Sequence, residues 1–133
     1  METMPPNGEG LLAADEPIAR YCSQSSHYTA STGRVKPSAV LPPPLDLRTS
    51  TFRILGLNND DIWALGDNVL AGSGKPLLAR AETIVRIVET VGLQVDPDNN
   101  PPRHAHIVGW PPDKEAQREL AVELAKRMTL VIR

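Results

Sequence analysis

Aromatic side chains are scarce in this chain, at 4% of 133 residues, so its core must be built from leucine, valine, isoleucine and alanine. There is one cysteine, Cys22, which excludes an internal disulfide and a zinc site with several cysteines and is typical of a reducing compartment. No apolar run approaches the roughly 20 residues of a membrane span. The first residues also lack the charged and apolar regions of a secretory signal. We therefore expect a cytoplasmic protein without membrane association.

The charge balance is close to neutral, with a formal net charge of −2. This value gives no support to a chain built to coat nucleic acid, although a local basic patch stays open. The length suits one domain. Residues 1–16 combine proline, glycine and acidic residues with little apolar periodicity, which predicts a flexible leader. We expect a single domain over residues 17–133.

Hydrophobic periodicity predicts alternating strands and helices after an irregular first third. Residues 16–22 are interpreted as one short helical turn, and the following residues up to 48 as loop and extended chain because they are rich in serine, threonine and proline. Strands are expected at 49–57, 77–82 and 129–133, a hairpin over 93–110, and helices at 58–71 and 114–128. Residues 83–91 fit either helix or strand, and we favour a short helix.

These elements together predict an α+β fold, in which a small, largely antiparallel sheet has two to three helices packed on one face. The last helix has the clearest pattern. Asp113 is its expected N-cap, and Leu120 and Leu124 share a stripe that should face the sheet. Its charged residues and Gln117 are expected on the solvent side.

The stretch "RHAHIVGW", from Arg103 to Trp110, holds two of the three histidines. On a strand, His104 and His106 point to one side, while Ala105 and Ile107 point into the core. Such a pair can supply two imidazoles to a metal, but a site needs at least a third ligand. The candidates for that ligand are His27, Asp96 and Asp98. The favoured interpretation is an ordinary polar face of a strand, so we expect no metal and no cofactor.

A second hypothesis uses no metal. Three arginines lie in or beside expected strands, and the two histidines follow the last of them. If the strands are neighbours, these side chains form a cationic pocket for phosphate or carboxylate, in which arginine binds the oxyanion and imidazole acts as acid or base. The candidate ligand-binding residues are Arg53, Arg80, Arg103, His104 and His106. The alternative is that the arginines pair with local acids such as Glu82.

Four segments occur together in this order: "TSTFRILGL", "DIWALGD", "LLARAE" and "PPRHAHIVGWPPDKEAQRELAVELA". Their combination resembles a family of small, uncharacterised bacterial proteins with an S-x-F-R-x-x-G-L segment and a later R-H-A-x-I-x-G-W-P segment before a terminal helix. The resemblance covers the chain from about Tyr21 onwards and implies no activity. It implies that shared segments contain Arg53, Arg103, His104 and Trp110. His106 stands where the family has an amide or another residue, so an H-x-H metal pair is not implied.

Two functional hypotheses remain. The first is a cytoplasmic binding or interaction module whose partner is a protein or a small anionic ligand. The alternative is a small enzyme or ligand-binding domain that acts on a phosphorylated compound or nucleic acid through the arginine and histidine cluster. Whether the protein is an enzyme stays open, because no intact catalytic motif occurs in the sequence.

Overall fold

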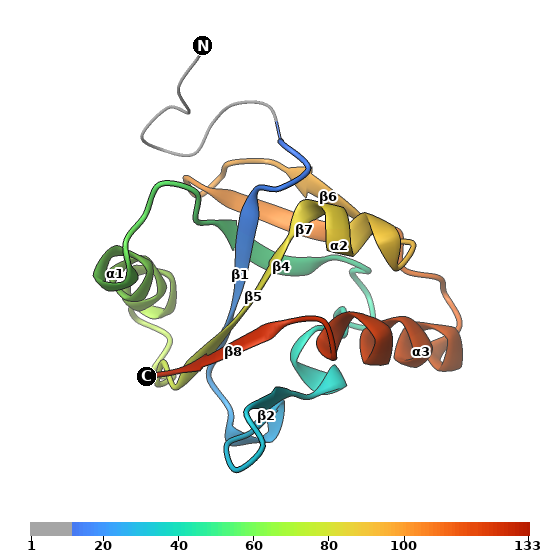
Figure 1. The fold of residues 1–133 in the computed structure, drawn as a ribbon, viewed down its shortest axis with the longest axis horizontal. Coiled ribbons are helices and arrows are strands. Elements are labelled where there is room, and N and C mark those ends of the chain that lie inside the picture. Colours follow the sequence, from blue (N-terminus) through green and yellow to red (C-terminus); the bar gives the residue numbers. More distant parts are fainter. Residues whose placement is uncertain (1–11) are drawn as a thin grey trace.

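A six-stranded sheet forms the centre of the computed structural model, which describes residues 12–133 (Figure 1). The strand order is β6-β7-β4-β1-β5-β8, and each pairing of neighbours is antiparallel. Its strands are β1 (Pro17–Cys22), β4 (Thr49–Arg53), β5 (Ala79–Ile84), β6 (Gln94–Pro97), β7 (His104–Val108) and β8 (Thr129–Ile132). The helices are α1 (Asn59–Leu70), α2 (Val85–Thr90) and α3 (Lys114–Ala125). The chain therefore has the α+β fold that the sequence predicts.

Short elements complete the fold between β1 and β4. They are the 3-10 turns η1 (Ser25–His27) and η2 (Pro37–Ala39), and a small hairpin of β2 (Tyr28–Thr29) and β3 (Arg34–Val35). The serine- and proline-rich composition led us to expect loop and extended chain here. The structure agrees for most of this segment, since its regular elements are only two or three residues long.

The helices lie on both faces of the sheet. Helices α2 and α3 pack on one face, as expected, and α1 packs against the other, so that α1 and α3 stand on opposite sides of the strands (Figure 1). Strand β1 shows the division, because successive side chains of a strand point to opposite faces. Ile18 and Cys22 join the core under α2 and α3, whereas Ala19 and Tyr21 join the core under α1.

The expected helical turn at residues 16–22 is wrong, because this segment is β1, an interior strand of the sheet. Both of its faces are covered, so it has no alternation of apolar and polar residues to identify it as a strand. Pro17 is tolerated because it is the first residue of the strand. The remaining strands and helices occur where the sequence predicts them, including the short helix α2 within residues 83–91 and the hairpin of β6 and β7. Their bounds differ in part, since β4 ends at Arg53 and not at residue 57, and β5 covers Ala79–Ile84 and not residues 77–82.

Gly66 explains how closely α1 approaches the sheet. A Cβ atom at this position would lie 2.7 Å from the ring of Tyr21 and 2.6 Å from Leu77. The Tyr21 hydroxyl donates a hydrogen bond of 2.6 Å to the carbonyl oxygen of Ile62, one turn earlier in the helix. The glycine that lowers the helix propensity of α1 therefore provides the space for Tyr21.

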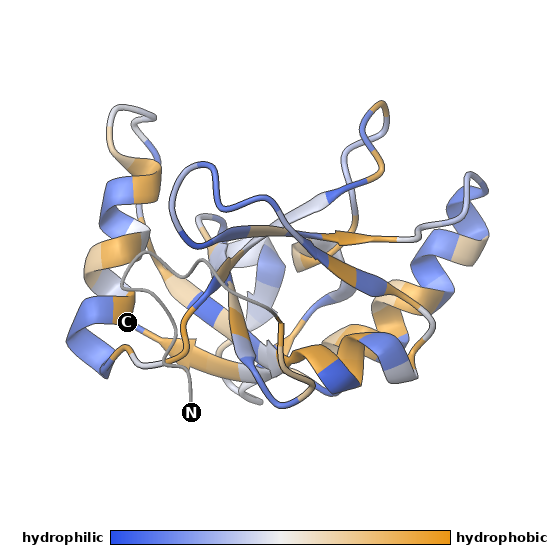
Figure 2. Ribbon diagram, turned by 90° about the horizontal axis from the view of Figure 1, so that it is seen from above, coloured by the Kyte–Doolittle hydropathy of each residue, from blue (hydrophilic) through white to orange (hydrophobic). Residues whose placement is uncertain are grey.

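Helix α3 is amphipathic, with apolar and polar residues on different sides (Figure 2). Asp113 caps it as expected, since its carboxylate accepts a hydrogen bond from the Ala116 N–H. Leu124 is fully buried and Leu120 is partly buried against the same core. Gln117 was expected on the solvent side but is buried, because its side-chain amide donates to the carbonyl oxygen of Pro111 at the helix start.

The end of the expected leader is attached to the domain. The carbonyl oxygen of Ala14 accepts a hydrogen bond from the Arg86 N–H, and that of Glu16 accepts one from the Val85 N–H. Residues 1–11 lie outside the described part of the chain, and the prediction of a flexible leader there stays a prediction. Between residues 12 and 133, no helix has the length and apolarity needed to cross a membrane.

Candidate functional site

His104 and His106 project from β7 to the same side of the sheet, as the alternation of the sequence predicts. Their rings stand nearly perpendicular, with centroids 4.4 Å apart. Ala105 and Ile107 point to the opposite face and are fully buried there. The two imidazoles lie on the same face as α1, but on the part of the sheet formed by β4, β7 and β6.

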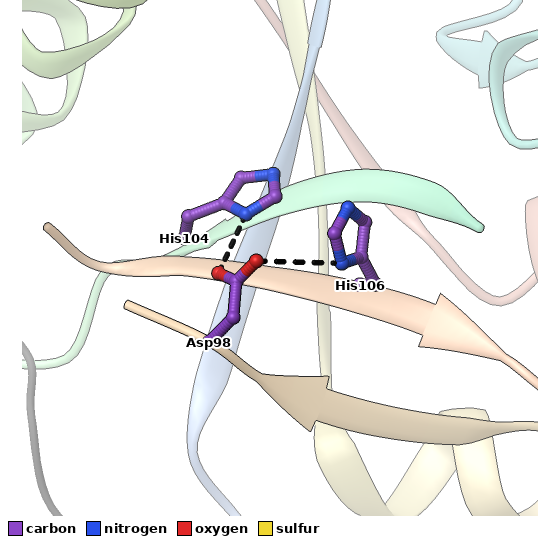
Figure 3. A group of neighbouring side chains, drawn as sticks. All are labelled: Asp98, His104 and His106. Atoms are coloured by element: carbon purple, nitrogen blue, oxygen red, sulfur yellow. Dashed lines mark hydrogen bonds and ion pairs between the residues drawn. The ribbon is translucent and has the colours of Figure 1, made fainter. Parts of the chain in front are cut away.

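Asp98 lies between the two imidazoles (Figure 3). Its carboxylate oxygen Oδ1 is 2.7 Å from Nδ1 of His104, and Oδ2 is 3.7 Å from Nδ1 of His106. The aspartate follows β6 directly, in the loop that leads to β7. The N–H groups of Asp98 and Asn99 both donate to the carbonyl oxygen of His104, at 3.3 and 2.9 Å, so the loop backbone holds the carboxylate beside the histidines.

The backbone conformation of this loop follows from its sequence, "DPDNNPPR". Asn99 and Arg103 have positive φ angles of 51° and 74°. Asparagine enters this left-handed region more readily than most residues, which helps the chain reverse between β6 and β7. The turn brings Asp98 back over β7, the strand that carries the histidines. His104 lies six residues after Asp98 in the sequence.

The electrostatic environment keeps the carboxylate charged. Partial burial raises the pKa of Asp98, but the hydrogen bond with His104, the Asn100 N–H and the two nearby imidazoles outweigh it and lower the pKa below its usual value. Burial is also the main cause that lowers the pKa of His106, and the neighbouring His104 adds to it. At neutral pH, Asp98 is therefore a carboxylate and His106 a neutral imidazole.

His104 is held from three directions. Its Nε2 atom lies 2.7 Å from the hydroxyl oxygen of Ser50 on the neighbouring strand β4. The ring of Phe52 meets it edge-on, with centroids 5.1 Å apart, and Phe52 itself packs into the core under α1. Asp98 completes the set. The His104 side chain is only 10% exposed, so both its nitrogens are engaged in a fixed orientation.

Asp98, His104 and His106 form a group with the donor atoms of a metal site. One ligand atom from each residue can be chosen so that all three lie within 4.8 Å of one another. Around a zinc ion, with bonds of about 2.0–2.2 Å, neighbouring ligand atoms stand roughly 3.5 Å apart, a spacing of the same order as that in this group. Of the three candidates for the third ligand, Asp98 belongs to this group, whereas His27 and Asp96 do not.

Each of the three arginines among the predicted ligand-binding residues has a partner inside the protein. Arg53 is fully buried and pairs with Glu16, through Nε to Oε2 at 2.5 Å and Nη2 to Oε1 at 2.8 Å. The side chain of Glu16 is equally buried. This bidentate pair engages Arg53 inside the protein.

The other two arginines also have internal partners. Arg80 binds Glu82 at 2.5 Å, which is the alternative that we considered for the arginines, and its guanidinium lies over the ring of Trp63 beneath α1. Arg103 donates through Nη1 to the carbonyl oxygens of Arg53, the last residue of β4, and of Leu55. The structure therefore brings His104 and His106 together and places Arg80 in the core region of α1.

Sequence reasoning missed Ser50 as part of this site. The alternation in "TSTFR" places Ser50 and Phe52 on one face of β4, which is a signal in the sequence. Only the register identifies the face, because Ser50 pairs with His106 and Phe52 with His104 across the two strands. That register joins segments more than 50 residues apart and cannot be obtained from local pattern.

Comparison with known proteins identifies no relative: no family model, no curated protein and no solved structure matches the chain. The fold and the site therefore describe this protein: it is an α+β domain with two histidines and one aspartate clustered on one face of its sheet.

Proposed function

We propose that this protein is a metal-binding module that holds one divalent transition-metal ion between Asp98, His104 and His106. The observation that supports it is the position of the Asp98 carboxylate between the Nδ1 atoms of both histidines. Two imidazoles and one carboxylate suit zinc and its neighbours in the first transition row, ferrous iron included. We retain a cytoplasmic location as part of this proposal.

The protonation states favour the metal-bound form. A metal ion needs deprotonated ligands, so a charged imidazole is a poor starting point. His106 has a lowered pKa and Asp98 has a lowered pKa, which leaves one neutral nitrogen and one anionic oxygen at neutral pH. Binding therefore displaces few protons from these two residues.

Ser50 has a supporting role in this proposal. A histidine that binds a metal through one nitrogen carries its proton on the other, and that N–H needs an acceptor. The Ser50 hydroxyl oxygen, 2.7 Å from Nε2 of His104, is such an acceptor. It leaves Nδ1 of His104 for the ion and fixes the ring in the plane that points toward Asp98.

The ligand set leaves coordination positions open. Three protein ligands with a free fourth position are typical of catalytic zinc, whereas structural zinc sites are closed by four. Asp98 is 40% exposed in its side chain, so solvent or a small ligand reaches this side of the group. The proposed module therefore binds the metal together with an exchangeable ligand.

The alternative of binding a phosphorylated compound or nucleic acid through the arginine and histidine cluster has less support. Arg53 and Arg80 direct their side chains to Glu16 and Glu82, which cancel their charge locally. An anion would have to compete with these carboxylates, and for Arg53 within a fully buried pair.

Isothermal titration calorimetry with zinc on metal-stripped protein tests the proposal. We expect one site per chain, and at least about a 100-fold loss of affinity in His106→Ala, since loss of a direct ligand should exceed the 10–100-fold effect of a supporting residue. Ser50→Ala should lose about 10–100-fold.

His27→Ala is the matched control, because His27 is the one histidine outside the group. It should bind zinc as the unmodified protein does. Equal zinc affinities of His106→Ala and the unmodified protein would refute the proposed site, as would a loss of binding in His27→Ala alone.

A further inference from the structure

Ser50, His104 and Asp98 form a chain of short contacts in which a hydroxyl, an imidazole and a carboxylate follow one another. Ser50 Oγ lies 2.7 Å from Nε2 of His104, and Nδ1 of the same ring lies 2.7 Å from Oδ1 of Asp98. A nucleophile within hydrogen-bond reach of a base, which is itself oriented by a third group, is the geometric signature of an activated hydroxyl. We propose that, in the metal-free protein, Ser50 is a nucleophile that accepts the acyl group of an ester.

The three residues come from three separate segments, and the fold holds each of them. Ser50 lies on β4, His104 at the start of β7, and Asp98 in the loop after β6. Ser50 and His104 are diagonal neighbours across the β4–β7 pairing and share one face of the sheet. Ser50 itself is partly exposed to solvent.

The arrangement of hydrogens follows from the charge of Asp98. The Oδ1 atom of Asp98 lies 2.7 Å from Nδ1 of His104. An ionised carboxylate only accepts hydrogen bonds, so the His104 proton is on Nδ1. The lone pair of Nε2 then faces Ser50, whose hydroxyl donates to it. This is the tautomer that a general base needs.

The reaction that follows is acyl transfer. Ser50 Oγ attacks the carbonyl carbon of the ester while Nε2 of His104 takes the hydroxyl proton. The bond from that carbon to the leaving oxygen breaks, and the proton passes from His104 to the leaving group. The products are an acyl-serine and an alcohol. A water molecule, deprotonated by His104 in turn, releases the carboxylic acid and restores Ser50.

Metal binding and this activity exclude each other. A metal ion takes the lone pair of Nδ1, so the His104 proton must then lie on Nε2. In that tautomer the ring donates to Ser50 and has no lone pair to accept its proton. The inference goes beyond the proposed function and does not rest on it, since it concerns the protein without metal.

A fluorophosphonate probe on metal-stripped protein tests the inference. The probe forms a bond from Ser50 Oγ to phosphorus, and fluoride leaves with the hydroxyl proton as hydrogen fluoride. We expect one label per chain, located on Ser50 by peptide mass spectrometry. It should be absent from Ser50→Ala and unchanged in Ser31→Ala, which removes an exposed hydroxyl in the turn after β2.

Asp98→Asn separates activation from simple exposure of the serine. Asp98 acts as a positioning residue through His104, so its amide variant should label about 100-fold more slowly or worse. The dependence of the labelling rate on pH should also differ from that of the unmodified protein. Circular dichroism checks that the variant is folded. Absence of label on Ser50, or a labelling rate and pH profile unchanged in Asp98→Asn, would overturn the inference.

Zinc distinguishes this inference from the proposed function. One equivalent of zinc should suppress labelling of Ser50 if both are right. Labelling that zinc does not affect would support the nucleophile and count against the metal site. Calorimetric zinc binding in a protein that the probe never labels would support the metal site and overturn the nucleophile.

Discussion

Glu16 and Arg53 form an ion pair in which neither side chain is exposed, joined by two hydrogen bonds of 2.5 and 2.8 Å. Glu16 is the residue before β1, and Arg53 ends β4, the neighbouring strand. The pair therefore fixes the start of the domain to the sheet. Arg53, in the segment "TSTFRILGL", therefore has a structural role through its bond with Glu16.

We expect Glu16→Gln to lower the free energy of unfolding by about 3–5 kcal/mol, because it leaves the buried guanidinium without a counter-charge. The double variant Glu16→Leu with Arg53→Met should lose less, since it removes both charges. Urea denaturation followed by circular dichroism measures both. A loss within about 0.5 kcal/mol for Glu16→Gln would contradict the buried pair.

Gly66→Ala should destabilise the protein by about 1–3 kcal/mol. A helix normally gains stability from this change, but here the added methyl would overlap Tyr21 and Leu77. Ala64→Gly on the exposed side of the same helix is the control, and it should cost about 1 kcal/mol through helix propensity alone. Thermal unfolding of both variants is the measurement. A stabilised Gly66→Ala variant would show that α1 stands farther from the sheet.

Leu124→Ala should cost about 2–5 kcal/mol, because this side chain is fully buried between α3 and the sheet. Leu120→Ala should cost less, since Leu120 is only partly buried at the same interface. Chemical denaturation of the pair tests the orientation of α3. The reverse order of losses would mean that the helix presents a different face.

Zinc affinity should depend on pH through His106. Burial and the neighbouring His104 lower its pKa below the usual 6.5 in the folded protein. A lowered pKa means that folding favours the neutral form of His106. The resulting contribution to the stability of the folded protein is complete above about pH 6.5, and it is lost as the pH falls through the lower pKa of the folded state. Because the metal needs the neutral ring, protonation of His106 should leave zinc binding equal at about pH 7 and 8 and weaken it at about pH 5.

Calorimetry at these pH values measures the effect, with His27→Ala as the control. His27 also has a pKa lowered by burial but lies outside the proposed site. Comparing the two proteins therefore separates the effect of a ligand histidine on zinc affinity from that of a histidine that does not bind the metal. Zinc affinity that stays constant until acid unfolds the protein would contradict ligation by His106.

Much of the fold follows from local pattern. Helix α3 has an N-cap at Asp113 and a periodic apolar stripe, and the hairpin of β6 and β7 brackets a segment rich in turn-forming residues. Each of these signals depends on residues close together in the sequence, and the structure confirms both elements. Strand β1 gave no such signal, because both of its faces are covered and its apolar residues do not alternate with polar ones.

The site was predictable only in part. The alternation of "HAHI" correctly placed His104 and His106 on one face, and Asp98 was among the candidate third ligands. Ser50 depends on the register between β4 and β7, which only tertiary structure supplies. The five-residue anion pocket depended in the same way on distant contacts, and Glu16 and Glu82 determine where its arginines point.

Titration of the metal-stripped protein with cobalt tests the metal site most directly, because the visible spectrum of cobalt reports its ligands and geometry. We expect absorption bands of a four-coordinate ion that saturate at one equivalent. These bands should shift when azide is added, since azide enters the open position, and they should be lost in the triple variant Asp98→Ala, His104→Ala, His106→Ala. A weak six-coordinate spectrum that is the same in that variant would contradict the proposed metal site.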